Sequence, residues 1–173
     1  MPALLPGAVR QNGYVVRDLD RTIEGWLAMG VGPWLLLPHL TQSGSTYRGQ
    51  LTAPVVSMAF ANSGDLQVEL IVQEDDSPSV YKEFLDVGHE GLHHHAWWVD
   101  DFPAVADAAA AAGWSEAMRG NVGGMADFAY FEVASAVPLV EVMELTDATR
   151  WLASKVRDAA RDWDGTDPVR PLS

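Results

Sequence analysis

Hydrophobic positions in the first seventy residues switch between strand-like and helix-like spacing. Residues 11–16 have the alternation of a short strand, and Asp18 directly behind them is a good helix N-cap. The apolar residues that follow recur at helical spacing up to Gly30, where a helix can stop. Three further alternating runs predict strands, at residues 34–38, 51–60 and 66–72. Residues 62–65 (NSGD) predict a hairpin turn, so this half is predicted to be β-α-β-β-β.

The second half of the chain repeats this pattern. Residues 94–99 predict a strand, Asp101 a helix cap, and Gly113 the end of an apolar helix. Three more strand-like runs follow, around residues 114–119, 126–132 and 138–143. An internal duplication is therefore predicted.

Two offsets make the duplication quantitative. The strand, cap, helix and stop signals of the two halves lie 83 positions apart, which places Gln11 on His94 (94 − 11). The segment LQVELI aligns with PLVEVM at an offset of 72, which places Glu69 on Glu141 (141 − 69). The difference of 11 residues between the offsets predicts extra loop residues in the first half.

The organisation predicted from these signals is one α+β domain over residues 8–145. Its modules, 8–73 and 91–145, are joined by a structured linker at 74–90, where the adjacent acids of residues 74–76 are expected to form a solvated loop face. Residues 146–173 predict an amphipathic helix followed by a frayed end, VRPLS.

The balance of charge limits the partners of the chain. Asp and Glu number 24 against 11 Lys and Arg, a net charge of −13 that repels nucleic acid and anionic membranes. The sequence shows no basic pocket, because the arginines are scattered: Arg10, Arg17, Arg21, Arg48 and Arg119. Small, largely uncharged substrates are therefore expected.

Cysteine is absent, so disulfides and thiolate metal sites are excluded and a metal would need nitrogen and oxygen ligands. The amino terminus, MPALLPGAVRQ, has no basic segment leading into an apolar one, and no later stretch has the length of a membrane span. A cytoplasmic location is the resulting expectation.

Strand geometry selects among the three adjacent histidines. Immediate neighbours in a strand face opposite sides, so His93 and His95 are expected to face away from His94 and to be core residues or supports. The repeat register pairs His94 with Gln11, and Glu69 with Glu141. These four residues are therefore predicted to point inward at the seam between the modules. Two carboxylates, one imidazole and one amide oxygen suit a divalent Zn, Co, Ni, Mn or Mg ion.

Four segments carry a resemblance to a known family. QNGYVVRDLDRTIEGWLAMGVGPW, GDLQVELI, GLHHHAWWVDDF and PLVEVMEL resemble, in this order, the vicinal oxygen chelate superfamily, which contains glyoxalase I, methylmalonyl-CoA epimerase, extradiol dioxygenases and the bleomycin resistance proteins. The resemblance covers about residues 8–145 and is greatest to the glyoxalase and epimerase branch.

The resemblance implies paired βαβββ modules that form a concave mixed sheet around a metal, with helices on the convex side. Carried over by position, the ligands of the family fall on Gln11, Glu69, His94 and Glu141. A dioxygenase is disfavoured because Gln11 breaks the two-histidine triad that binds iron. The arginine of glyoxalase I that binds glutathione is replaced by Val15. A homodimer is also implied.

The leading hypothesis is a metal-dependent isomerase, epimerase or lyase that acts through a metal-stabilised enolate. Its substrate would be a small apolar carbonyl compound or an acyl thioester, and Glu141 and Glu69 would be the two bases. The resemblance favours Glu141 as the principal base. The alternative is a metal-free binding protein that sequesters an aromatic small molecule, as the bleomycin resistance proteins do.

Overall fold

The computed structural model describes residues 4–134 and 137–172. Its elements are, in chain order, β1 (Gln11–Val15), α1 (Leu19–Ala28), β2 (Trp34–Thr41), β3 (Ser45–Tyr47), β4 (Gln50–Thr52), β5 (Val55–Ser63), β6 (Leu66–Gln73), α2 (Val80–Asp86), β7 (Gly91–Val99), α3 (Phe102–Ala111), β8 (Ser115–Asn121), β9 (Asp127–Glu132), β10 (Leu139–Glu144), α4 (Asp147–Ala160) and β11 (Val169–Pro171). The strands form one mixed sheet in the order β11-β2-β5-β6-β1-β7-β10-β9-β8-β3-β4. The predicted α+β class is confirmed.

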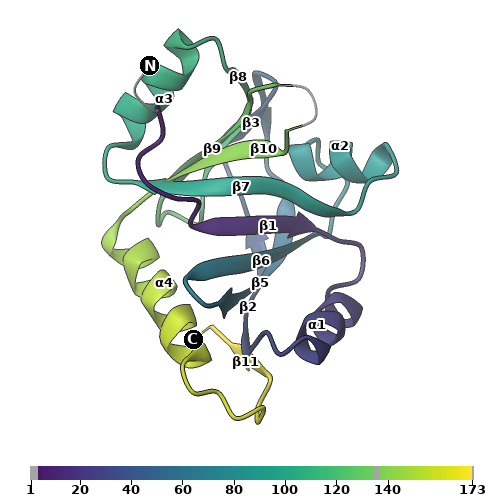
Figure 1. Ribbon diagram of the computed structural model, residues 1–173. Helices are drawn as coiled ribbons and strands as arrows, with labels where there is room; N and C mark the ends of the chain where they lie inside the picture. Colours follow the sequence, from purple (N-terminus) through teal and green to yellow (C-terminus); the bar gives the residue numbers. More distant parts are fainter. Residues whose placement is uncertain (1–3, 135–136, 173) are drawn as a thin grey trace.

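An approximate twofold axis passes through the centre of the sheet, between β1 and β7, which lie side by side in Figure 1. Their antiparallel register pairs Asn12 with His95, residues 83 positions apart, and Nδ1 of His95 lies 2.7 Å from Oδ1 of Asn12. Strand β1 pairs with β6 and strand β7 with β10, both in parallel. Gln11 lies opposite Gln67, and His94 opposite Leu139, so the register agrees with both offsets read from the sequence.

Helices α1 and α3 have equivalent starts and stops. The side chain of Asp18 accepts a hydrogen bond from the Arg21 amide at 3.0 Å, and Asp101 accepts one from the Ala104 amide at the same distance. Each helix is followed by a glycine with positive φ, 80° at Gly30 and 84° at Gly113. The capping signals therefore start and stop both helices as predicted.

The extra residues of the first half form the hairpin of β3 and β4. Its turn places Arg48 and Gly49 at φ 47° and 79°, the conformation of a tight two-residue hairpin turn. Strand β3 then pairs with β8, where Thr46 lies opposite Arg119. A hairpin from the first half thus extends the sheet of the second half.

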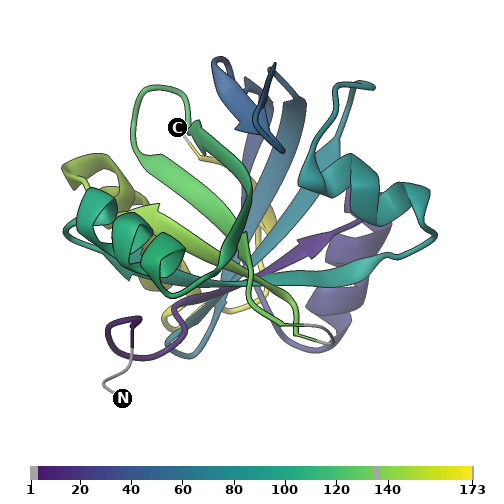
Figure 2. The ribbon, with the colours of Figure 1, turned by 90° about the horizontal axis from the view of Figure 1, so that it is seen from above.

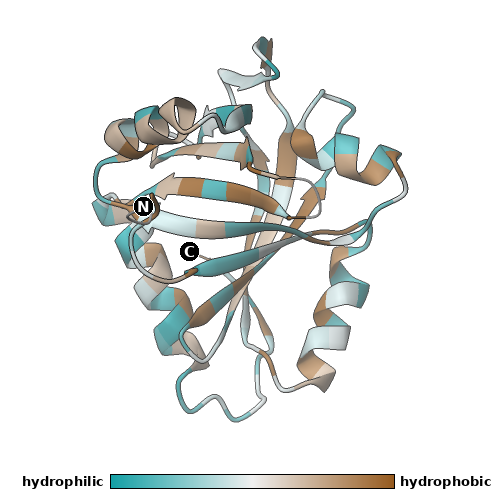
Figure 3. Ribbon diagram, turned by 45° about the horizontal axis from the view of Figure 1, so that its top comes forward, coloured by the Kyte–Doolittle hydropathy of each residue, from teal (hydrophilic) through white to brown (hydrophobic). Residues whose placement is uncertain are grey.

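The sheet bends into a deep cup when it is seen from above (Figure 2). Helices α1 and α3 cover its convex side. Ile23 of α1 packs there in one core cluster with Trp34, which is fully buried, and Phe102 of α3 packs in another. Hydropathy colours show the brown, apolar stretches concentrated in the strands, while the helices have mixed faces (Figure 3).

Helix α4 packs on the concave side, against β5 and β6. Its Val156 is fully buried in the main core cluster, together with Met58 of β5. The segment after α4 was expected to fray, but Val169 to Pro171 pair in parallel with β2 as strand β11. Among the helices that the structure describes, none has the length and apolar character needed to cross a membrane.

Candidate metal centre

Three buried side chains converge at the bottom of the cup. Nε2 of His94 lies 3.4 Å from Oε2 of Glu69 and 3.4 Å from Oε2 of Glu141. All three residues are at most 3% exposed, and their potential ligand atoms lie within 4.8 Å of one another. Nε2 of His94 and Oε2 of Glu141 have no hydrogen-bond partner among the described residues. The three atoms therefore approach one another as the ligands of one cation would.

Neighbouring strands bring these residues together. Glu69 of β6 lies opposite Gly13 of β1, and Gly13 lies opposite His94 of β7. A β-carbon built on Gly13 would lie 1.8 Å from Cε1 of His94, so only glycine leaves room for the imidazole here. Glu141 of β10 lies opposite Ala96, two residues after His94 on β7.

Gln11 lines the same cavity, on β1. Its Nε2 donates a hydrogen bond to Oε1 of Gln67 at 2.7 Å, while its own Oε1 is buried without a partner. An unpaired buried carbonyl oxygen is costly unless a ligand or water meets it. Gln67 thus turns the oxygen of Gln11 away from itself and leaves it available to a cation.

His93 differs from expectation because β7 contains a bulge. Gly13 pairs with His94 but Tyr14 pairs with Leu92, which leaves His93 as the extra residue. A bulge breaks the strict alternation of side chains, so His93 does not face away from His94. Its Nδ1 lies 3.0 Å from Nδ1 of His94, and both rings are buried. His95 does lie on the other side, bonded to Asn12.

The electrostatics of the histidine pair favour one arrangement of protons. Burial lowers the pKa of His93 well below its usual range and keeps that ring neutral, so its Nδ1 can accept the Nδ1 proton of His94. Burial also disfavours the charged form of His94, but the negative charges of Glu141 and Glu69 outweigh it and raise the pKa of His94 to about 9. Nδ1 of His94 therefore carries a proton in both states. Its Nε2 faces the two carboxylates with a lone pair when the ring is neutral and with a proton when the ring is charged.

Glu69 experiences the same low-dielectric surroundings. Burial raises the pKa of its carboxyl group above the ordinary value, against the attraction of His94, and the nearby charge of Glu141 raises it further. Two carboxylates this close to one imidazole carry an excess of negative charge in a buried site. A divalent cation would neutralise that excess, so the donor set fits such an ion.

The cavity around these residues is small and mostly apolar, with a volume of about 40 Å³, which is room for only a few water molecules. Phe60, Phe128 and Trp98 are among its lining residues, whereas Lys and Arg are absent from the described lining. Helix α4 closes one side with Leu152 and Ala153. A substrate larger than a few atoms therefore requires movement of this wall.

Two buried tyrosines supply hydroxyl groups to the cavity. The hydroxyl oxygens of Tyr81 and Tyr130 lie 3.1 Å apart, and Nε2 of Gln42 donates to Tyr81 at 3.3 Å. Burial raises the pKa of both phenols, so both remain protonated donors. Tyr130 lies directly opposite Glu141 in the sheet, and its ring centroid is 5.0 Å from that of His94.

Sequence reasoning missed several residues of this site. Gln67 stands two positions before Glu69, and the alternation of the strand already places it on the same face. Tyr81 lies in the linker helix α2, where the sequence has no signal that points to the site. Of the aromatic residues, Trp34 lies in the core beneath α1, whereas Phe128 and Tyr130 line the cavity.

Comparisons with known proteins agree with this fold. The model of the Glyoxalase/Bleomycin resistance protein/Dioxygenase superfamily matches residues 10–131, more than half of the chain. Among curated proteins, none matches.

Solved structures with a similar fold include three informative examples. A hypothetical protein of Bacillus halodurans C-125 is 18% identical, with a TM-score of 0.59, and the match covers 81% of this chain and 95% of that one. Methylmalonyl-CoA epimerase of Mycobacterium tuberculosis is 19% identical, with a TM-score of 0.58 and coverages of 87% and 95%. A variant of the Streptomyces coelicolor methylmalonyl-CoA epimerase, in complex with 2-nitronate-propionyl-CoA, is 18% identical, with a TM-score of 0.56 and coverages of 81% and 95%.

At these identities the structural matches show the fold alone, whereas the family model matches the sequence itself. The cupped sheet, the paired modules and the buried Glu69, His94 and Glu141 are consistent with that match. The chain belongs to the glyoxalase/bleomycin resistance protein/dioxygenase superfamily.

Proposed function

We propose that this protein is a metal-dependent isomerase, epimerase or lyase that acts on a small apolar carbonyl compound or an acyl thioester. The observation that carries the proposal is the pair of buried carboxylates, each 3.4 Å from one histidine nitrogen in an apolar cavity. Gln11, Glu69, His94 and Glu141 would hold the ion. A divalent cation bound there supplies positive charge that stabilises the negative charge of an enolate.

The protein side chains then have to move one proton. In the proposed reaction the deprotonated Glu141 takes the proton from the carbon next to the carbonyl group, and Glu69, protonated at the start, gives its own proton to the other face of that carbon. The two residues come from β10 and β6, on opposite sides of the approximate twofold axis, which is the arrangement that an epimerase needs. A cation favours the charged form of a carboxylate that it binds, so a glutamate of this site would act as a base only once the substrate oxygen has displaced it.

The surroundings support proton transfer next to a carbonyl group. The apolar walls exclude water, which would otherwise compete for the substrate oxygen and weaken the electrostatic interactions. One of the hydroxyl groups of Tyr130 and Tyr81 donates in their mutual hydrogen bond, and the proton of the other can orient an oxygen atom in the cavity.

Elemental analysis of the purified protein tests the metal directly. We expect about one divalent ion per chain, retained through dialysis, and loss of that ion in the His94→Ala, Glu141→Ala double variant. Stoichiometric metal in the double variant would show that these residues are not the ligands. A wild-type protein that neither contains nor takes up metal would favour the sequestration of an aromatic molecule instead.

Solvent deuterium exchange tests the reaction. Small acyl thioesters and branched carbonyl compounds would be incubated in D₂O with the metal-loaded protein, and incorporation next to the carbonyl group would be followed by mass spectrometry. We expect incorporation by the wild type, and a rate at least a hundredfold lower in Glu141→Gln at full metal occupancy. If Glu69→Gln alone abolishes exchange, the two glutamates have the opposite roles. If neither substitution slows exchange, the enolate mechanism is wrong.

A further inference from the structure

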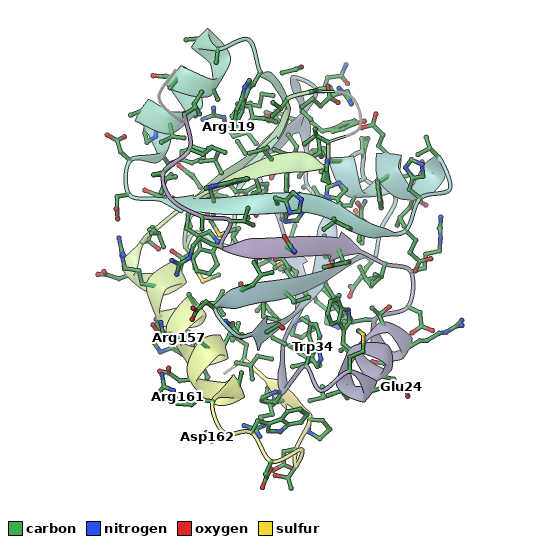
Figure 4. The ribbon with its side chains drawn as sticks, viewed as in Figure 1. Glu24, Trp34, Arg119, Arg157, Arg161 and Asp162 are labelled. Carbon is green, nitrogen blue, oxygen red and sulfur yellow. The ribbon has the colours of Figure 1, made fainter. Side chains whose placement is uncertain are left out.

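The structure brings one arginine from the beginning of the chain beside two arginines of α4. Arg10, from the segment before β1, and Arg150 and Arg157, from α4, line one pocket of about 450 Å³ between this segment and the helix. No Asp or Glu is among its described lining residues. The chain has a net charge of −13, so the positive charge of this pocket is opposite in sign to the charge of the chain as a whole. Figure 4 shows Arg157 projecting from α4.

The three guanidinium groups are available to an external anion. Arg10 stacks over the ring of Trp98, 5.3 Å from its centroid, and forms no ion pair with any residue that the structure describes. Arg150 pairs with Asp100, whose side chain is 80% exposed, and Arg157 pairs with the adjacent Asp158 at 3.3 Å. Exposed pairs of this kind contribute little, so an anion can replace them at low cost. Guanidinium groups also match the geometry of phosphate oxygens.

This arginine pocket adjoins the metal cavity. Trp98 and Ala153 line both spaces, so the two are separated by a single layer of side chains. Nε1 of Trp98 is buried without a hydrogen-bond partner among the described residues. The cavity itself has no cationic side chain in its described lining. A molecule with an apolar carbonyl end and an anionic end would therefore place the carbonyl end in the metal cavity and the anionic end in the arginine pocket, with Trp98 between them.

We propose that Arg10, Arg150 and Arg157 form a binding site for a phosphate group, carried by the substrate whose carbonyl end reaches the metal cavity. The substrate connection rests on the proposed function, whereas the phosphate site rests on the pocket alone. Three cations around one dianion favour phosphate over a singly charged carboxylate. On this proposal the substrate has an apolar reacting end and a phosphorylated remote end.

Inorganic phosphate is the probe for the site, added to the full-length protein after the metal has been removed by a chelator. The readouts are calorimetry and the indole N–H resonance of Trp98, which is assigned by its loss in Trp98→Phe. We expect one saturable site, with phosphate at least tenfold tighter than acetate at equal ionic strength. Arg10→Gln and Arg157→Gln should each weaken phosphate about tenfold.

Arg161→Gln is the matched control, because Arg161 lies one helical turn after Arg157 (Figure 4). It is not among the lining residues of the arginine pocket. It should bind phosphate like the wild type. Equal weakening in all three variants, or no saturable binding, would overturn the proposed site. If phosphate binds as expected but no deuterium exchange is found, the proposed function is overturned and the phosphate site is retained. Urea midpoints within a few tenths molar of the wild type would show that the variants are folded.

Discussion

Single residues decide whether the candidate metal centre can form. Gly13 is an example, because the ring of His94 occupies the space where any other residue would place its β-carbon. The repeat register of the sequence identified His94, Glu69 and Glu141 as inward-facing, and the structure brings these three together. It did not identify Gly13, because a glycine in a strand has several common explanations and only the register of β1 against β7 distinguishes them.

Substitution of this glycine is the first prediction. Gly13→Ala places a carbon 2.1 Å from Nε2 of His94, so the ring or the strand must shift. We expect a loss of about 1–3 kcal/mol in the free energy of unfolding and at least a tenfold weaker affinity for metal. Urea denaturation and metal titration measure the two effects.

Gly25→Ala is the control for that change. Gly25 is exposed in α1, and an added β-carbon meets nothing within 4 Å. Alanine should stabilise the helix by up to about 1 kcal/mol and leave metal affinity unchanged. Wild-type affinity in Gly13→Ala would mean that His94 does not need its observed position to bind the ion.

At the scale of elements, the sequence predicted the helix ends, which depend on neighbouring residues. Features that depend on contacts with distant segments were not predicted. The caps at Asp18 and Asp101 and the stops after both helices follow from nearby residues, and they were predicted correctly. The bulge at His93 depends on how β7 meets β1, and strand β11 depends on the free edge of β2. A single sequence has no signal for either, because both arise from pairing with a distant segment.

Glu74 illustrates how a distant contact changes the role of a residue. The sequence placed it in a solvated acidic face, and the neighbouring Asp76 is indeed fully exposed. Glu74 is exposed as well, but its carboxylate also accepts hydrogen bonds from Ser57 of β5 and from Nδ1 of His39, the latter at 2.6 Å. His39 has a φ of 54° within the irregular part of β2. Glu74 thus ties the end of β6 to two other strands.

This contact predicts a dependence on pH. The hydrogen bonds from Ser57 and His39 lower the pKa of Glu74 below its ordinary value of 4.5. A lowered pKa in the folded state contributes stability that is complete above pH 4.5 and is lost as the pH falls through the folded-state value. Glu74→Gln should therefore cost about 1 kcal/mol at pH 7, and the difference from wild type should shrink by pH 3. Urea midpoints at both pH values would measure it, and a constant difference would contradict this account.

At the scale of the whole molecule, the two halves interlock at several places. Strand β1 pairs with β7, the hairpin of the first half pairs with β8, and α4 and β11 of the second half return to pack on β5 and β2. The proposed ligands are divided in the same way, with Gln11 and Glu69 from one half and His94 and Glu141 from the other. A bound ion would therefore hold together segments that are far apart in the chain.

The last prediction follows from this division. An ion that binds only the folded state stabilises it by RT ln(1 + [L]/Kd), about 4 kcal/mol at a free concentration one thousand times Kd. For a chain of 173 residues this corresponds to a rise of roughly 10 °C in the unfolding temperature. Because both halves contribute ligands, the metal-loaded protein should still unfold in one cooperative transition. Calorimetry with added Zn²⁺ and with chelator measures the rise. His94→Gln should unfold at the same temperature with and without the ion, and a full-sized shift in that variant would show that the ion stabilises the protein from another site.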